Sequence, residues 1–405
     1  MTPALEHHWP ATFRHAQTHS PFYRDRFGAV AGVPPLESLP PVDKALLSAR
    51  NLDFLCVPRG RIAEIVTTSG TTGQPLLWML TAADVQRLAW NEKLSFECAG
   101  LTARDTVLVA VALDRCFIAG LAYWQGLRAL GCTVVRVGPS SPLLVLEMIE
   151  RLEPTAIVAV PSFLRVIADK AREVGFELAK SPVKKAVCIG EPVRDSALAL
   201  NTAGRAIAAA WGAQVYSTYG VTELANSLGE CDAGAGGHLH EEMLHLEILD
   251  DDGRPLADGE VGEVVATTFG VEAMPLIRYR TGDCAALFGA PCACGRTTPR
   301  LGPIVGRKNQ RLKFKGVSLF PSTLQAVLEQ AEGVEAFVIV ARAAGELSDA
   351  VEVLVQGPAS VPALREALQA RAKIAPQIRH VTRAEIEALQ LPPQARKRRT
   401  FVDLR

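Results

Sequence analysis

Residues 84 to 189 alternate between helical segments and short apolar, β-branched runs, and this alternation limits the fold more than any other feature of the chain. Such runs are typical of strands buried on both faces of a parallel or mixed sheet. We therefore predict an α/β layer in which helices cover the sheet on both sides. The expected strands are 106–112, 133–137, 156–160 and 183–189, and the expected helices are 84–99, 120–130, 143–152 and 162–174.

Two further regions have different patterns. Residues 245–290 contain alternating extended runs around an Asp-rich turn at 250–253, which predicts a β-rich subdomain of hairpins. After the Gly302-Pro303 break, strands and helices alternate over about a hundred residues, which suits a small α+β domain. We expect a large N-terminal domain at 1–306 and a small domain at 307–405.

Composition excludes several classes of protein. The 43 basic residues balance the 43 acidic ones, so the chain shows no general surface for nucleic acid or membrane. The N-terminus lacks the pattern of a secretory signal, and the apolar runs are too short to span a bilayer. Nine cysteines scattered over 405 residues indicate reduced thiols, so we expect a cytoplasmic protein.

Residues 67–75 read Thr-Thr-Ser-Gly-Thr-Thr-Gly-Gln-Pro and follow an extended apolar run. Glycines allow backbone N–H groups to point at a ligand, and hydroxyl groups add further donors without bulk. The loop therefore suits a polyphosphate, although it lacks the Gly-Lys-Ser/Thr ending of the common phosphate loop. A polar surface turn is the alternative.

Four more motifs carry groups that suit a nucleotide. An aromatic ring, a glycine, a hydroxyl and an acid at a strand end can stack a base, admit a phosphate and hold a metal ion. An ionised carboxylate can accept hydrogen bonds from both hydroxyls of a ribose. Each motif alone is equally consistent with a turn, a solvated acid or a basic tail. The motifs are 219–223 (Tyr-Gly-Val-Thr-Glu), 279–283 (Tyr-Arg-Thr-Gly-Asp), 306–317 with its Gly-Arg and Lys-Phe-Lys-Gly-Val, and Arg396-Lys397.

Cys292 and Cys294 have the short spacing of a metal-binding turn, and Cys231 and His238 lie upstream. Four such ligands suit a closed, tetrahedral, structural zinc site. Free, partly buried cysteines are the alternative. Cys284 and His240 are substitute ligands.

Taken together, these motifs resemble those of the adenylate-forming superfamily of acyl-CoA ligases, adenylation domains and luciferases. The resemblance covers almost the whole chain and is strongest for the phenylacetate–CoA ligase-like branch. The segments that carry it are 21–23 (Pro-Phe-Tyr), 189–192 (Ile-Gly-Glu-Pro), 276–283 (Leu-Ile-Arg-Tyr-Arg-Thr-Gly-Asp), 316–321 (Gly-Val-Ser-Leu-Phe-Pro) and 401–405 (Phe-Val-Asp-Leu-Arg).

The resemblance implies a reaction in two halves. A carboxylate first attacks the α-phosphate of ATP, which gives an acyl-adenylate and pyrophosphate. The thiol of coenzyme A then attacks the acyl carbon, and AMP leaves. Fixed donors and cations are needed because two anions meet and charge develops during transfer.

The resemblance also implies a role for each motif. Ser69, Gly70, Thr71, Thr72 and Gly73 would hold the β- and γ-phosphates. Glu223 would ligate Mg²⁺, Thr222 would contact the α-phosphate, and Tyr219 with Gly220 would flank adenine. The adenine pocket would be lined by Gly190, Glu191 and Pro192, and the ribose would be held by Asp283 and Arg307.

The small domain is expected to rotate between the two halves. One orientation would deliver the catalytic Lys397, and the other would bring Lys315 and Gly316 to a pantetheine tunnel. The sequence departs from the family pattern at three positions. Gln74 replaces a lysine, Asn309 replaces the hinge acid, and Arg396 replaces a glycine.

The acid is expected to bind at a strand-to-helix junction of small apolar residues, which suits a flat aryl ring. The residues concerned are Phe117, Ile118, Ala119, Gly120 and Ser162. Core packing is the alternative for each of them. An aryl or arylacetic acid is therefore the expected substrate.

Two other functions remain open from the sequence. The first is an adenylation enzyme that passes the adenylate to the thiol of a carrier protein. The second is a non-catalytic nucleotide-binding regulatory module. A homodimer also remains open as an expectation.

Overall fold

The computed structural model describes residues 2–28, 30, 32–68, 76–314, 317–344, 348–391 and 399–405. The chain divides into two compact units, Met1–Pro303 and Ile304–Arg405. The boundary expected from the sequence lies slightly further along the chain, between residues 306 and 307.

The first unit begins with three helices, α1 (Pro3–His19), α2 (Pro21–Phe27) and α3 (Lys44–Ala49). The side chains of Thr2, Ser20 and Asp43 cap their N-termini by accepting backbone hydrogen bonds. The chain before α3 runs beside strand β12 (Tyr279–Phe288), since the Val42 N–H donates to the Arg278 carbonyl at 2.9 Å. This pairing brings the start of α3 close to Tyr279.

A six-stranded sheet forms the centre of the first unit, with strand order β4-β3-β5-β6-β7-β8. All neighbouring pairs are parallel except the last, in which β8 runs antiparallel to β7. The strands are β3 (Thr106–Val109), β4 (Thr133–Arg136), β5 (Ala156–Ala159), β6 (Lys185–Ile189), β7 (Gln214–Val221) and β8 (Asn226–Gly229).

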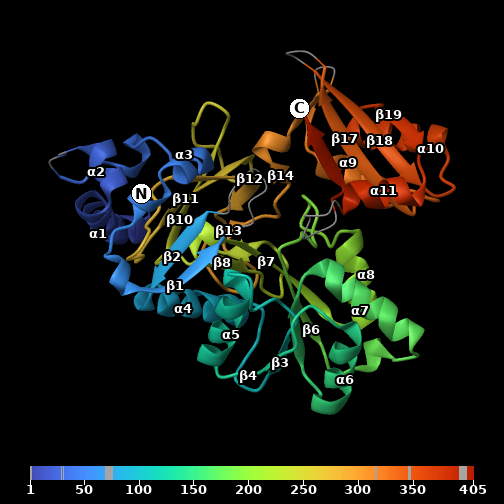
Figure 1. The fold of residues 1–405 in the computed structure, drawn as a ribbon, viewed down its shortest axis with the longest axis horizontal. Helices are drawn as coiled ribbons and strands as arrows, with labels where there is room; N and C mark the ends of the chain where they lie inside the picture. The colour runs from blue at the N-terminus through green and yellow to red at the C-terminus, as the bar shows by residue number, and fades with distance from the viewer. Residues whose placement is uncertain are drawn as a thin grey trace. The chain divides into compact units, whose positions relative to one another are not determined.

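Helices cover both faces of this sheet, as Figure 1 shows. Alternate strand residues supply the two cores, because successive side chains of a strand point to opposite faces. Leu108 and Ile157 pack with α6, α7 and α8, whereas Val107 and Val158 pack with α4 and α5. The helices are α4 (Ala82–Cys98), α5 (Ile118–Leu130), α6 (Pro142–Leu152), α7 (Pro161–Glu173) and α8 (Thr202–Trp211).

Two antiparallel sheets complete the first unit. The hairpin β1 (Ile62–Thr67) and β2 (Leu77–Thr81) flanks the hydroxyl-rich loop in sequence. The larger sheet has the order β10-β11-β12-β13-β9. Its strands, besides β12, are β9 (Gly237–His238), β10 (Leu244–Leu249), β11 (Val261–Thr268) and β13 (Arg300–Leu301).

The second unit has a four-stranded sheet of order β19-β18-β17-β20. Ile339 and Val353 pack with α9 and α10, and Val338 and Leu354 pack with α11 on the other face. The strands of the second unit are β14 (Gly306–Arg307), β15 (Leu312–Phe314), β16 (Val317–Leu319), β17 (Ala336–Ala343), β18 (Asp349–Gln356), β19 (Gln377–His380) and β20 (Phe401–Leu404). Its helices are α9 (Pro321–Leu328), α10 (Val361–Ala372) and α11 (Arg383–Gln390).

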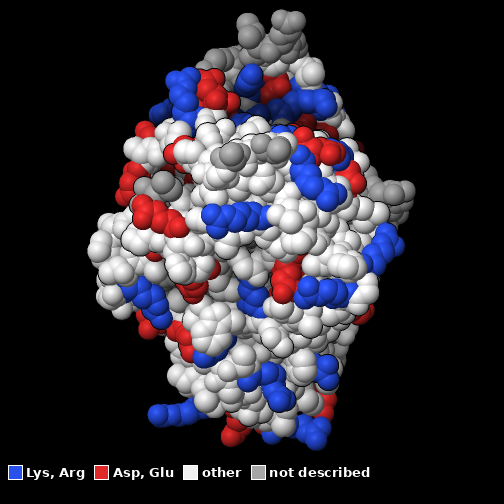
Figure 2. All heavy atoms as spheres, turned by 90° about the vertical axis from the view of Figure 1, so that its left-hand side faces the viewer, with Lys and Arg blue, Asp and Glu red and all other residues white. Residues whose placement is uncertain are grey.

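The structure confirms the predicted combination of an α/β layer, a β-rich subdomain and a small α+β region. On the described part of the face drawn in Figure 2, basic and acidic side chains are interspersed, in keeping with the zero net charge. Within the described residues, the helices are too short or too polar to cross a bilayer.

Candidate active site

Several of the predicted site residues follow parallel strands of the central sheet, at its carboxyl edge. Ser162 follows β5, Gly190 follows β6 and Glu223 follows β7. The chain order reverses between β3 and β5, because β4 lies on one side of β3 and β5 on the other. Ligands of open α/β sheets bind at such a reversal, outside the carboxyl ends of the strands.

Part of the predicted site lies outside the described residues. This part comprises the phosphate loop, the pair expected at the pantetheine tunnel, and the expected catalytic lysine: Ser69, Gly70, Thr71, Thr72, Gly73, Lys315, Gly316 and Lys397. The strand that leads into this loop is described. The Thr67 N–H donates to the Cys116 carbonyl at 2.9 Å, which ties the end of β1 to the loop after β3.

Glu223 is an almost fully buried carboxylate, with 4% of its side chain exposed. It lies in the short 3₁₀ helix η5 (Thr222–Leu224) that ends β7. The Tyr279 hydroxyl donates to Glu223 Oε1 at 3.3 Å, and the Lys44 ammonium lies 3.3 Å from the same oxygen. The ammonium offsets part of the cost of burying this carboxylate, and a carboxylate oxygen is also a preferred ligand of Mg²⁺.

Lys44 is a site residue that the sequence analysis missed. It comes from α3, and 45% of its side chain is exposed, so the ammonium reaches Glu223 from the solvent side. A single lysine after a Pro-rich stretch carries no local signal for function. The pairing of Val42 with Tyr279 brings it to Glu223.

Tyr219 and Asp283, predicted at adenine and ribose, meet in the structure. The Tyr219 hydroxyl donates to Asp283 Oδ2 at 3.0 Å, and the Asp283 N–H donates to the Thr281 hydroxyl at 3.1 Å. Burial, together with the negative charge of Asp283, raises the pKa of Tyr219 well above its usual value. The phenol therefore stays protonated, and its ring is held at the end of β7.

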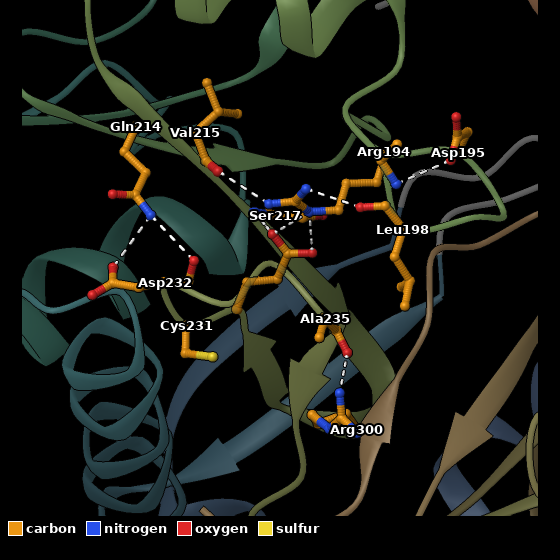
Figure 3. Close-up of polar contacts among 12 residues, drawn as sticks. Arg194, Asp195, Leu198, Gln214, Val215, Ser217, Cys231, Asp232, Ala235 and Arg300 are labelled. Atoms are coloured by element: carbon orange, nitrogen blue, oxygen red, sulfur yellow. Dashed lines mark hydrogen bonds and ion pairs between the residues drawn. The ribbon is translucent and has the colours of Figure 1, made fainter. Parts of the chain in front are cut away.

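The segment expected at adenine, Gly190 to Pro192, is followed in the sequence by a residue that forms a buried ion pair. Arg194 Nε donates to both oxygens of the buried Glu230, at 2.7 and 2.8 Å. The same guanidinium donates to the carbonyls of Leu198 and Val215, as Figure 3 shows. The Ser217 N–H also donates to Glu230, at 2.9 Å. This network fastens the chain after β6 to β7, although neither Arg194 nor Glu230 was singled out from the sequence.

Glu191 and Ser162, predicted for different ligands, bond directly to each other. Glu191 accepts hydrogen bonds from the Ser162 N–H at 2.8 Å and from its hydroxyl at 2.7 Å. The bonds join the first turn of α7 to the loop after β6. Glu191 therefore satisfies a backbone N–H at the start of α7, and its place near adenine stays a prediction.

The acyl candidates follow β3, next to the chain reversal of the sheet. Arg115 and Cys116 both have positive φ angles, of 59° and 54°. Strained backbone of this kind is concentrated at functional sites. Phe117 is exposed, Ala119 is half-buried, and Ile118 is buried.

Gly120 has a clear packing role. A Cβ atom at this position would lie 2.0 Å from the Ala112 carbonyl oxygen, so only glycine allows α5 to approach the loop after β3 this closely. Contact of Gly120 with the acid stays a prediction. The expected ribose ligand Arg307 lies on β14, in the second unit, and is exposed.

The four predicted metal ligands come together. Their ligand atoms, from Cys231, His238, Cys292 and Cys294, all lie within 4.8 Å of one another. The Cys231 and Cys292 sulfurs are 3.6 Å apart, and Cys294 Sγ lies 3.5 Å from His238 Nε2. A tetrahedron with Zn–S bonds of about 2.3 Å has edges of roughly 3.7 Å, so these spacings fit a tetrahedral ion.

The surroundings of this cluster also suit a metal. His238 Nδ1 lies 3.3 Å from the Thr298 hydroxyl, which leaves Nε2 facing the cysteines. Burial lowers the pKa of His238 to about 4, so its ring is neutral, as a ligand must be. Desolvation opposes ionisation of Cys294, yet hydrogen bonds from Arg296 lower its pKa to about 7. Gly295 has a φ of 89°, which the turn carrying both cysteines requires.

Comparison with known proteins adds an independent observation. A family model described as "AMP-binding enzyme" matches residues 37–272. A phenylacetate–coenzyme A ligase of Thermus thermophilus is 34% identical over 345 residues, which cover 82% of this chain and 76% of that protein. The enzyme of the same name from Aromatoleum evansii is 32% identical, covering 78% of this chain and 72% of the relative.

The fold has been seen in solved structures. The structure of a 2-hydroxyisobutyryl-CoA ligase, in a postadenylation state with a bound acyl-AMP, matches with a TM-score of 0.82. It is 22% identical in sequence, and the match covers 98% of this chain and 88% of that one. At this identity the match shows the fold alone.

Proposed function

This chain belongs to the AMP-binding enzyme family, and we propose that it joins an aryl or arylacetic acid to coenzyme A with ATP as the energy source. The observation that carries the proposal is the 34% identity to a phenylacetate–coenzyme A ligase over 82% of the chain. The gathering of Tyr219, Glu223 and Asp283 at one edge of the sheet supports it.

The enzyme is an acid–CoA ligase that forms AMP. ATP activates the carboxylate as an acyl-adenylate, and coenzyme A then takes the acyl group as a thioester. Little covalent chemistry is left to the protein, because positioning and electrostatic stabilisation supply most of the rate in phosphoryl and acyl transfer. The function expected from the motifs is confirmed at this level by the relatives.

We assign the first half-reaction to the carboxyl edge of the central sheet. Glu223 would hold Mg²⁺ beside the phosphates, because a buried carboxylate is a preferred ligand of this ion. Thr222 would contact the α-phosphate, and Asp283 would accept the ribose hydroxyls. Asp283 already accepts a hydrogen bond from Tyr219, which orients the carboxylate before the nucleotide arrives.

The remaining roles follow the resemblance. Residues 69–73 would hold the β- and γ-phosphates, and residues 190–192 would line the adenine pocket. Lys397 would bridge the acid and the α-phosphate, and Lys315 with Gly316 would line the path of pantetheine. Since Lys397 and Lys315 lie in the small C-terminal region, its rotation between the half-reactions is part of this proposal.

The cysteine cluster is proposed to hold a structural Zn²⁺. Three thiolates and one imidazole would fill all four positions of a tetrahedral ion, so the ion would stabilise the fold and take no part in the reaction. The cluster joins the end of β8 to strand β9 and to the turn between β12 and β13. It would therefore brace the central sheet against the β-rich sheet.

A pyrophosphate-release assay tests the proposed function. Purified protein with ATP and Mg²⁺ is offered phenylacetate, benzoate and a long-chain fatty acid, with and without coenzyme A. We expect release with the aryl acids and an acyl-CoA product only when coenzyme A is present. Preference for the fatty acid would refute the substrate class. Transfer to an acidic carrier protein but not to free coenzyme A would refute the acceptor.

A further inference from the structure

Two of the four predicted metal ligands, Cys231 and His238, lie at the two ends of one short loop between β8 and β9. The loop turns sharply after its first ligand, where the Gly234 N–H donates to the Cys231 carbonyl at 2.9 Å. Gly234 has a φ of 58°, and a Cβ atom at this position would lie 2.4 Å from Arg194 Nη2. Glycine is therefore required both by the turn and by the guanidinium that packs against it.

Arg300 holds this loop against the segment that carries the other two ligands. It pairs with His238 between strands β13 and β9, and its Nη1 donates to the Ala235 carbonyl at 2.8 Å, as Figure 3 shows. Its Nη2 donates at 2.9 Å to the carbonyl of Ala290, two residues before Cys292. One buried arginine thus aligns both segments of the cysteine cluster.

Glu230, directly before Cys231, links the loop to β7 and to Arg194. Its carboxylate accepts from Arg194 Nε at 2.7 and 2.8 Å and from the Ser217 N–H at 2.9 Å. The side chains of Arg194 and Glu230 are only 12% and 2% exposed. Displacement of either partner would leave the other charge buried and uncompensated, which is costly. A shift of the ligand loop would therefore disturb Arg194.

Arg194 in turn fastens the chain that follows β6. Its Nη1 donates to the Leu198 carbonyl at 3.0 Å, and the φ of 66° at Leu198 marks a tight loop. This loop returns to the segment expected at adenine, because the Asn201 amide donates to the Pro192 carbonyl at 2.9 Å. The ion pair of Arg194 thus connects the metal-ligand loop with residues 190–192, which we assign to adenine.

A metal ion and a nucleotide would each restrict this connection. A tetrahedral ion would fix Cys231 and His238 relative to the other two ligands. Adenine would order residues 190–192 from the other end. Whichever binds first bears the cost of ordering the shared segments, so the second binds more tightly. Coupling of this kind acts equally in both directions and typically changes affinity by about 5- to 150-fold.

We propose that Arg194 is a positioning residue through which a metal ion at the cysteine cluster raises the affinity for adenine nucleotides. This inference rests on the proposed function. It gives the proposed structural zinc a second effect, on nucleotide binding, that acts through the Arg194–Glu230 pair and needs no contact between metal and nucleotide.

The test measures the affinity for AMP by isothermal titration calorimetry, on zinc-loaded protein and on protein stripped of zinc with a chelator. We expect the zinc-loaded protein to bind AMP about 5- to 20-fold more tightly. In the reverse measurement a chelating dye competes for Zn²⁺, and AMP should raise the affinity for Zn²⁺ by the same factor. Circular dichroism establishes whether the stripped protein is folded.

The deciding variant is Arg194→Met with Glu230→Leu. It removes both charges together, because apolar residues of similar volume can replace a buried ion pair with little loss of stability. This variant should retain zinc, and the effect of zinc on the AMP affinity should disappear.

The matched control is Arg278→Met with Glu247→Leu. This is a second buried bidentate pair of the first unit, and its arginine also binds two carbonyls. The control should keep the wild-type factor. If stripping unfolds the chain, the reverse measurement decides, because coupling through folding alone would raise the Zn²⁺ affinity equally in the wild type and in both variants.

Equal affinity of the folded zinc-loaded and zinc-free proteins for AMP would overturn the proposal. An undiminished factor in the Arg194–Glu230 variant, in either direction, would also overturn it. A protein that takes up no zinc would overturn it too, while the ligase function would stand. Absence of AMP and ATP binding from the zinc-loaded protein would count against the proposed function, and the inference would fall with it.

Discussion

At the scale of single residues, the most consequential contact is the one between Lys44 and Glu223. Residue type and motif were enough to single out Glu223, Tyr219 and Asp283 from the sequence. Lys44 was not identified from the sequence, because its contact is with a residue far away in the chain. The same holds for Arg194 with Glu230, and for Arg87, whose bonds to three carbonyls come only from tertiary folding.

Lys44→Met removes the cation that neutralises a buried carboxylate. We expect the ligand-free protein to lose about 1 kcal/mol of stability, since Lys44 is half exposed and its charge is partly screened. If Glu223 holds Mg²⁺ as proposed, Mg²⁺ with ATP should reduce this loss, because the metal would take the place of the ammonium. Thermal unfolding with and without Mg²⁺-ATP measures both effects.

Lys180→Met is the control for this prediction, because its ion pair with Glu177 lies on the surface. Its Tm should barely change, and any change should not depend on the ligand. If the Tm deficit of Lys44→Met were the same with and without Mg²⁺-ATP, Lys44 would be a structural residue only.

At the scale of elements, the sequence predicted the buried strands well and the short polar ones poorly. The strands β3 to β6 were found because runs such as Val107–Val109 are apolar on both faces. Strands β8 and β9 were missed, since the former begins with two polar residues and the latter spans Gly237–His238 only. The cluster of three cysteines and His238 was still predicted, because cysteine spacing can be read without knowledge of the strands that carry it.

Zinc binding is the prediction that belongs to these elements. We expect about one zinc per chain in the purified protein and none in the double variant Cys292→Ser, Cys294→Ser, since thiolates are lost from the tetrahedron. Elemental analysis measures this, and Tm of the double variant should fall because bound metal contributes to folding.

Cys56→Ser serves as the control, because Cys56 is buried but lies outside the cluster. It should retain zinc. A native protein without zinc, whose Tm is indifferent to a chelator, would contradict the assignment.

At the scale of the whole molecule, the chain forms two compact units, and the sequence anticipated a large and a small part. It also anticipated the fold class, because alternation of strands and helices limits how sheets are covered. The order of the strands was not predictable in this way. The reversal between β3 and β5 is a property of the assembled sheet, and it explains why residues after these two strands gather together.

The prediction at this scale concerns which of the two half-reactions depends on Lys397 of the second unit. Lys397→Ala should slow acid-dependent pyrophosphate release by about a hundredfold, because the cation proposed to act at the transferring group would be lost. Thioester formation from added acyl-adenylate should continue, since the proposed rotation withdraws the lysine from that step. Single-turnover assays of each half-reaction measure the split.

Lys373→Ala, at the end of α10 in the same unit, is the comparison variant and should leave both rates unchanged. Equal slowing of both half-reactions by Lys397→Ala would argue against a role confined to adenylation.

The anchoring of β8 by Arg87 has a consequence for how the first unit holds together. Three carbonyls from separate stretches converge on one guanidinium, so a single side chain of α4 ties the start of β8 to the start of β10 and the end of β11. Loss of this one side chain should therefore loosen the central sheet from the β-rich sheet.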